Sequence, residues 1–218
     1  AVWSMTVTFL SMWDYVRNTR ENYERYRPAP AASVPATGFV QPYTDSPLDD
    51  EPVGETVYLS LINRACRSVY ITTPYLIIDD TMTAALCASA KSGVDVRIMT
   101  PHIPDKAIVF ELTRAHYGPL LEAGVKIYEY TPGFLHAKSF AVDDLYGTVG
   151  SINMDYRSLF LHFENGVLLY GTPSVKEIRA DFEATLEQCQ EITLEQWRSF
   201  PIHRKLMWSV LRVAAPLV

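Results

Sequence analysis

Two basic side chains and a run of small polar residues stand close together in the second half of the sequence. His136 and Lys138 are separated by one residue, Asp143 follows, and Gly150-Ser151-Ile152-Asn153 comes shortly afterwards. An imidazole can attack phosphorus or carry a proton, and an ammonium group can hold phosphate oxygens. Ser and Asn add hydroxyl and amide donors, after a glycine that lets the backbone approach a ligand. We therefore expect phosphodiester chemistry that proceeds through a phospho-histidine.

The segment that carries the two basic residues has the pattern of a buried strand, which we expect at 136–142. Residues two apart on a strand project from the same face, so His136 and Lys138 should point together into one pocket. Lys138 would compete with a metal ion for the same oxygens, and no Cys/His or carboxylate cluster has ligand spacing. We expect neither a metal nor a cofactor.

The rest of the chain alternates between helical and strand patterns. Helices are expected at about 2–22, 55–66, 80–92, 105–123, 173–190, 193–199 and 202–213, and strands at 68–73, 94–99, 125–130, 136–142, 146–150 and near 164–170. A further strand is expected at 38–43, inside a Pro-rich segment at 27–54. This alternation predicts an α/β domain, and a short hairpin at Asp143-Asp144 makes the expected sheet a mixed β-sheet flanked by helices.

The composition narrows the class of protein. The 218 residues, 48% of them hydrophobic, suffice for one substantial domain. The net charge of −6 argues against a general nucleic-acid binder but allows an anionic lipid substrate. Three widely spaced Cys form no zinc pattern. The apolar stretch from Ala1 to Trp13 is too short to span a bilayer.

The spacing H-x-K-x4-D-x6-G-S-x-N resembles the signature of the phospholipase D superfamily. The run from Asn153 to Glu164 looks like the second such motif of bacterial cardiolipin synthases. The resemblance covers nearly the whole chain, more weakly before residue 38. Further agreement lies in Thr73-Pro74-Tyr75-Leu76, in 103–128 and in Gly133-Phe134-Leu135. The resemblance implies a phospholipase D-like domain at 38–218. It implies that 1–37, a helix with a Pro-rich linker, belongs to a preceding half.

The resemblance also implies roles for individual residues. The catalytic candidates are His136, Lys138 and Asp143, the phosphate-binding candidates are Ser151 and Asn153, and Glu164 is expected to orient a motif histidine. Asp143 stands at odd spacing from His136 and begins a turn, so a role in fixing that turn is favoured over direct chemistry. Tyr75 and His162 are weaker candidates for substrate contact.

Members of this family use two H-x-K motifs across a pseudo-twofold interface, and this chain has one. The resemblance implies phosphatidyl transfer between two phosphatidylglycerols, giving cardiolipin and glycerol. His136 would be the general acid and base, with the nucleophile on the missing half or on a second copy. A phosphodiester hydrolase or nuclease and an inactive half-site fragment remain open. The implied partners are phosphatidylglycerol and the membrane surface, without nucleic acid, in a bacterial membrane with the domain facing the cytoplasm.

The last expected helix, 202–213, has an apolar stripe beside basic residues. The stripe consists of Leu206, Met207, Val210, Leu211 and Val213. The helix could pack on the domain, or it could lie on a membrane surface, where Trp208 would suit the lipid interface. His203-Arg204-Lys205 also spells H-x-K, but neither the Asp nor the Gly-Ser-x-Asn follows.

Overall fold

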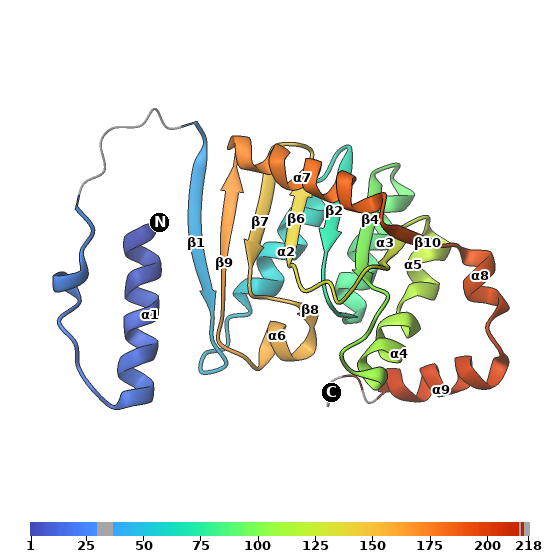
Figure 1. Cartoon of the computed structure of the whole chain (residues 1–218), viewed down its shortest axis with the longest axis horizontal. Helices are drawn as coiled ribbons and strands as arrows, with labels where there is room; N and C mark the ends of the chain where they lie inside the picture. Colours follow the sequence, from blue (N-terminus) through green and yellow to red (C-terminus); the bar gives the residue numbers. More distant parts are fainter. Residues whose placement is uncertain (30–36, 214, 216–218) are drawn as a thin grey trace.

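A mixed eight-stranded sheet forms the middle of the protein (Figure 1). The computed structural model describes residues 1–29, 37–213 and 215. The order across the sheet is β1 (Phe39–Asp45), β9 (Glu164–Tyr170), β7 (Tyr146–Gly150), β6 (Ser139–Val142), β2 (Ser68–Thr72), β4 (Asp95–Pro101), β5 (Lys126–Tyr130) and β10 (Cys189–Ile192). β2, β4 and β5 are parallel, and the other neighbouring pairs are antiparallel. A small parallel sheet pairs β3 (Leu76–Ile77) with β8 (Met154–Asp155).

Helices cover both faces of the large sheet, as the alternating pattern predicted. α2 (Val53–Arg64), α3 (Asp80–Lys91) and α5 (Tyr117–Ala123) cover one face, and α7 (Pro173–Leu186) crosses the other (Figure 1). Successive strand residues serve opposite faces. Val69 and Ile71 pack in the core beneath α2 and α3, whereas Tyr70 stacks on Phe182 of α7 with ring centroids 5.0 Å apart.

The remaining helices lie around this layered body. They are α1 (Val2–Arg17), the short 3-10 helix η1 (Tyr23–Tyr26), α4 (Ala107–Ala115), α6 (Tyr156–Phe160), α8 (Leu194–Ser199) and α9 (Ile202–Val213). α1 stands beside β1, at the left of Figure 1, and α4 and α9 pack together at the other side. Within the residues that the structure describes, no helix has the length and apolarity needed to cross a bilayer.

Several of the expected helix boundaries were wrong. The helix expected at 105–123 is divided at His116 into α4 and α5, because Pro119 has no N–H to donate to the carbonyl of Ala115. The helix expected at 2–22 ends at Arg17, where Asn18 takes the left-handed conformation with φ 50°. The helix expected at 173–190 ends at Leu186.

Three strands also differ from expectation. β10 was not expected, because its Gln and Glu residues are good helix formers. Antiparallel pairing with β5 overrides that preference. The strand expected at 136–142 begins only at Ser139, so His136 and Lys138 lie in the segment that enters β6. β1 extends the strand expected at 38–43 to Asp45 and pairs with β9 along its whole length.

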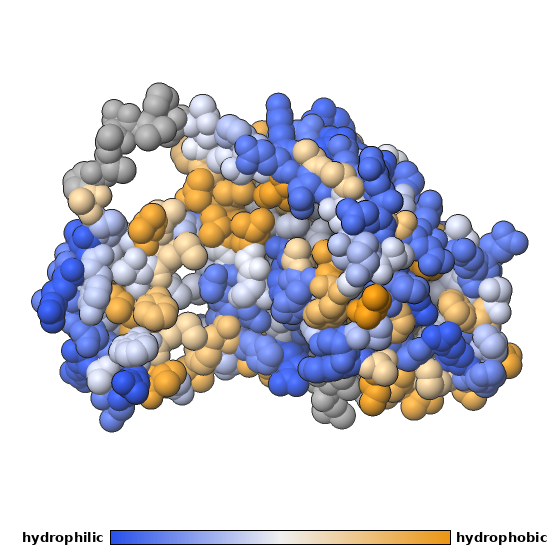
Figure 2. Space-filling model, in the orientation of Figure 1, coloured by the Kyte–Doolittle hydropathy of each residue, from blue (hydrophilic) through white to orange (hydrophobic). Residues whose placement is uncertain are grey.

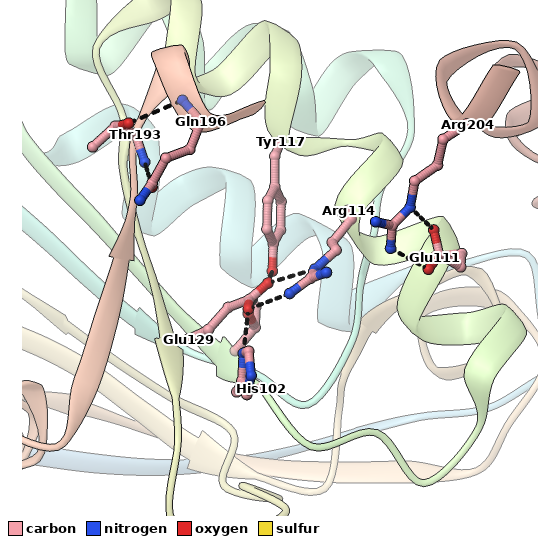
Figure 3. A network of polar contacts seen from close by, with 9 residues as sticks. His102, Glu111, Arg114, Tyr117, Glu129, Thr193, Gln196 and Arg204 are labelled. Atoms are coloured by element: carbon pink, nitrogen blue, oxygen red, sulfur yellow. Dashed lines mark hydrogen bonds and ion pairs between the residues drawn. The ribbon is translucent and has the colours of Figure 1, made fainter. Parts of the chain in front are cut away.

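A buried ionic network holds α4 and α5 to the sheet (Figure 3). Glu129 of β5 is fully buried and accepts hydrogen bonds from Arg114 Nε at 2.8 Å and from the Arg114 terminal nitrogen at 2.6 Å. The same carboxylate lies 2.8 Å from His102 Nδ1 and accepts a bond from the Tyr117 hydroxyl at 3.2 Å. Because a buried carboxylate is costly without partners, this set of bonds ties the outer strands to α4 and α5.

Candidate active site

The sheet topology brings the ends of four strands to one edge. The register pairs Thr72 at the end of β2 with Ser139 at the start of β6, and Ser139 with Val149 of β7. It also pairs Gly150, the last residue of β7, with Gly166 near the start of β9. The segments that enter β6, leave β7 and begin β9 therefore emerge together. These segments carry His136, Lys138, Ser151 and Glu164.

His136 is exposed at this edge, among aromatic side chains. Its ring lies 5.4 Å from the ring of Phe134 and 6.5 Å from that of Tyr75, measured between centroids. Partial burial is the main cause that lowers the pKa of His136 below its usual value, and the nearby Lys138 cation adds to this shift. The charge of Asp105 opposes it. The imidazole is therefore mainly neutral at pH 7, the form that can attack phosphorus or accept a proton.

Lys138 is half-buried beside His136, and its ammonium group donates to the His136 carbonyl at 2.7 Å. Burial lowers the pKa of Lys138, while the negative charges of Glu164 and Asp155 act in the opposite direction. The two side chains thus lie near each other, as the spacing predicted, although the residues precede the strand.

Ser151 is held between β7 and the start of β9. Its amide donates to the carbonyl of Asn165 at 2.8 Å, and the Asn165 amide donates to the Ser151 hydroxyl at 3.0 Å. The hydroxyl in turn donates to the Glu164 carboxylate. Gly150 makes this close approach possible, because a Cβ there would overlap the Asn165 carbonyl oxygen.

Asn153, two residues after Ser151 in the chain, lines a cavity of about 180 Å³. The side-chain oxygen of Asn153 is buried and has no hydrogen-bond partner among the described residues. The other lining residues are mainly polar or cationic: Tyr75, Ile77, Lys106, Val109, Asp155, Tyr156, Arg157, His162 and Ala215. The cavity thus offers amide, ammonium and guanidinium groups, which are suited to a phosphate group.

Glu164 contacts residues of its own half of the motif. Besides accepting from Ser151, its carboxylate lies 3.7 Å from Nδ1 of His162. Within the described residues, the polar contacts of Glu164 are to these two side chains and not to His136. The motif histidine that Glu164 was expected to orient is therefore not His136 of the same chain in this arrangement.

Asp143 lies at the other end of β6, away from His136. Its carboxylate accepts hydrogen bonds from the amides of Cys66, Arg67 and Ser68 at 2.7, 2.8 and 2.8 Å. Although partial burial opposes the shift, these bonds and the Arg67 charge leave the pKa of Asp143 below its usual value. Asp143 and Asp144 have φ of 55° and 59°, as a type I′ hairpin turn requires. The structure therefore separates Asp143 from the other catalytic candidates and gives it a structural position.

Sequence reasoning missed four residues around the site. Asp105 accepts a hydrogen bond of 2.6 Å from the Tyr75 hydroxyl, and Lys106 lines the cavity. Asp155 begins α6 by accepting from the Ser158 amide at 2.8 Å, and Arg157 follows it. The sequence signal was limited to the place of Asp155 and Arg157 in the run from Asn153 to Glu164, because Asp155 ends β8 and Arg157 lies in α6, so strand alternation does not link them.

Solved structures share this architecture. Nuc from Salmonella typhimurium, a phospholipase D family member, matches with a TM-score of 0.61 and 20% identity over 71% of this chain and 98% of its own. Phosphatidylserine synthase from Haemophilus influenzae matches with a TM-score of 0.63 and 16% identity over 82% of this chain and 48% of its own. The fold is that of the phospholipase D family.

Sequence comparisons narrow the family further. The family model described as "Cardiolipin synthase, PLD-like domain" matches residues 58–186. Cardiolipin synthase 2 of Bacillus anthracis is 37% identical over 100% of this chain, and an uncharacterized protein of Streptococcus mutans is 47% identical over 99% of it. The chain belongs to the cardiolipin synthase family of phospholipase D-like proteins. It spans 42% and 46% of the lengths of these two relatives.

Proposed function

We propose that this chain supplies one half of an active site that transfers a phosphatidyl group between two phosphatidylglycerols. The observation that carries the proposal is the His136–Lys138 pair at the sheet edge, together with the polar cavity that contains Asn153, Lys106 and Arg157. Tyr75 links the two, because it lines the cavity and its ring lies 6.5 Å from that of His136. Relatives named cardiolipin synthase match along the whole chain, and the chain covers less than half of their length. A second H-x-K motif, on the rest of a longer protein or on a second copy, would complete the site.

The reaction has two displacement steps at phosphorus. In the first, a neutral motif histidine attacks and forms a phosphorus–nitrogen bond, and glycerol leaves with a proton from the other histidine. In the second, that histidine takes the proton from the glycerol hydroxyl of another phosphatidylglycerol. The resulting oxygen attacks phosphorus, the phosphorus–nitrogen bond breaks, and cardiolipin forms. Lys138, Ser151 and Asn153 would hold the non-bridging oxygens.

His136 is our candidate for the proton-transferring histidine. This role needs a pKa near the working pH, and the pKa of His136 is lowered in this half alone. An approaching carboxylate would raise it again. We propose that Glu164 and its counterpart on the opposing half orient each other's histidines, since Glu164 contacts Ser151 and His162 within its own chain. The site would work at a bacterial membrane, with this domain on the cytoplasmic face.

A chimera tests the proposal. The matching segment of Bacillus anthracis cardiolipin synthase 2 is replaced by this chain, and conversion of labelled phosphatidylglycerol is followed in vesicles. His136→Ala should lower cardiolipin formation by about 10²–10⁴-fold. His203→Ala is the matched control, because His203 is also exposed and belongs to an H-x-K triplet on α9; it should leave the rate unchanged. Wild-type turnover by His136→Ala would refute the assignment, and phosphatidic acid as the main product would favour hydrolysis.

The chain by itself tests the half-site. We expect no turnover from a monomer, and a rate per molecule that rises with concentration if two copies pair their motifs. Mixing wild-type chain with an excess of His136→Ala chain should then suppress that rate, because mixed pairs lack one histidine. Full phosphatidyl transfer by a demonstrated monomer would contradict the half-site proposal.

A further inference from the structure

α9 has two apolar faces, and only one of them packs on the protein. Trp208 is 2% exposed, and its indole nitrogen donates to Glu111 of α4 at 2.7 Å. Arg204 joins the same carboxylate at 2.5 and 3.0 Å, so α9 is anchored to α4 (Figure 3). Of the two positions considered for this helix, Trp208 therefore takes the one packed on the domain, and it does not face lipid.

The second face is a row of aliphatic side chains, which we term the outer stripe: Ile202, Leu206, Val210 and Val213. Their exposed fractions are 85%, 68%, 65% and 84%. The spacing places them on one side of the helix, about half a turn from Trp208 and Leu211, so they point away from the domain. Figure 2 shows hydrophobic side chains gathered at its lower right, where α9 lies.

The segment that carries the outer stripe has basic residues and no acidic ones. Residues 198–218 contain four Lys or Arg and no Asp or Glu, although the whole chain has 25 acidic against 19 basic residues. Arg198 and Arg204 pair with Glu122 and Glu111. Within the described residues, Lys205 and Arg212 have no carboxylate at ion-pair distance. Both lie along the same side of the stripe, between it and Trp208, and Lys205 also donates to the Arg198 carbonyl at 2.6 Å. The stripe is thus bordered on one side by cations, in a protein that is otherwise acidic.

We propose that the outer stripe of α9 docks on the surface of an anionic bilayer. A helix with an aliphatic face and flanking cations lies in the interface, with its side chains in the acyl boundary and its cations at the headgroups. A protein partner fits less well. Four aliphatic side chains offer on the order of 400 Å², about half of what each side of a stable protein interface buries.

The position of α9 gives this surface a use that rests on the proposed function. α9 leads to Ala215, which is buried against Ile77 and Leu112 and lines the cavity that contains Asn153. A bilayer in contact with the stripe would therefore lie close to the candidate phosphate site. A phosphatidylglycerol headgroup could then enter while its acyl chains stay in the membrane.

Vesicle binding by the full chain tests the proposal without requiring catalysis. Co-sedimentation is measured with vesicles of phosphatidylcholine alone and with vesicles of equal parts phosphatidylcholine and phosphatidylglycerol. We expect binding only to the second, weakening as ionic strength rises. Leu206→Asp/Val210→Asp should weaken it at least about tenfold, since two aliphatic side chains leave the acyl boundary. Leu206→Ser/Val210→Ser removes the apolar surface without adding charge and should also weaken it.

Leu48→Asp is the matched control. Leu48 is 65% exposed, like Val210, but lies beside Asp49, Asp50 and Glu51, so its substitution should not change binding. His136→Ala should bind like the wild type, which separates docking from the proposed chemistry. Unchanged binding by folded Leu206→Ser/Val210→Ser would overturn the proposal. So would a lipid-free change in sedimenting mass on that substitution, because the stripe would then be a protein interface.

Discussion

The hydroxyl of Ser151 donates a hydrogen bond to the carboxylate of Glu164, thirteen residues further along the chain. The same oxygen accepts from the amide of Asn165 at 3.0 Å, so the position of the hydroxyl is fixed from two sides. Ser151 can donate to a phosphate oxygen only if its hydroxyl turns away from Glu164. The two side chains therefore act as one unit in any reaction at this edge.

That coupling predicts non-additive kinetics. In the chimera described above, Ser151→Ala and Glu164→Gln should each lower kcat/KM for phosphatidylglycerol, and the double variant should lose less than the product of the two effects. The expected coupling is about 0.5–3 kcal/mol, because the two residues share one hydrogen bond. Ser151→Ala combined with His203→Ala is the uncoupled control. Independent effects of Ser151 and Glu164 would show that the bond has no part in catalysis.

Asp143 should contribute to the stability of the protein and not to its turnover. Asp143→Ala leaves three backbone amides without their acceptor and should lower the free energy of unfolding by about 2–3 kcal/mol. Asp143→Asn tolerates the positive φ and keeps one acceptor oxygen, although it lacks the charge. It should therefore lower the free energy of unfolding less than Asp143→Ala does. Urea unfolding measures both effects. Turnover per folded molecule should stay at the wild-type level in the chimera; a loss as large as that of His136→Ala would instead make Asp143 catalytic.

His116 should make the stability of the protein fall in weak acid. The ring is buried, and its desolvation lowers the pKa to about 4 from 6.5. Between these two pH values the unfolded chain binds the proton and the folded chain does not. Stability is therefore full above pH 6.5 and falls as the pH drops towards 4, by up to about 3 kcal/mol.

Asn at position 116 is the matched variant, because its amide can still donate to the Leu112 carbonyl, which His116 Nδ1 contacts at 2.9 Å. Urea unfolding of the wild type and His116→Asn at pH 7.5 and near pH 4 should show a smaller difference for the variant. An equal pH dependence in both proteins would assign it to other groups.

Chelation should leave activity intact. Across residues 1–29, 37–213 and 215, no three His, Cys, Asp or Glu side chains gather as a metal site would require. Turnover of the chimera in EDTA should match that in its absence. Loss of activity that one divalent ion restores would show that a metal takes part, with Asp49-Asp50-Glu51 as the first segment to substitute.

The motif was the part of the site that sequence alone could locate. Spacing predicted that His136 and Lys138 lie together, and the Asp143-Asp144 turn correctly implied a hairpin and a mixed sheet. The cavity was not predictable, because Lys106 and Arg157 come from segments far apart that meet only through the packing of α4 and α6 beside β3 and β8.

The predicted boundaries of helices and strands were wrong where tertiary contacts decide them. β10 follows α7 with a composition typical of a helix, and only the free edge of β5 makes it a strand. The position of Trp208 could not be decided from the sequence for a similar reason. Its amphipathic surroundings fit both packing on the domain and a lipid interface, and the carboxylate of Glu111, about a hundred residues earlier in the chain, holds the indole inside.

The four residues between Lys138 and Asp143 set the distance between the basic pair and the hairpin turn. β6 consists of these four residues, with the basic pair before its first residue and Asp143 just past its last. One inserted residue would shift the pairing of β6 by a step and exchange its two faces. Either the segment that carries His136 and Lys138 would then be displaced at the sheet edge, or Asp143 would lose the amides of 66–68. The spacing within this motif therefore equals the length of β6. Inserting or deleting a residue would move either the basic pair or the turn residue out of its position.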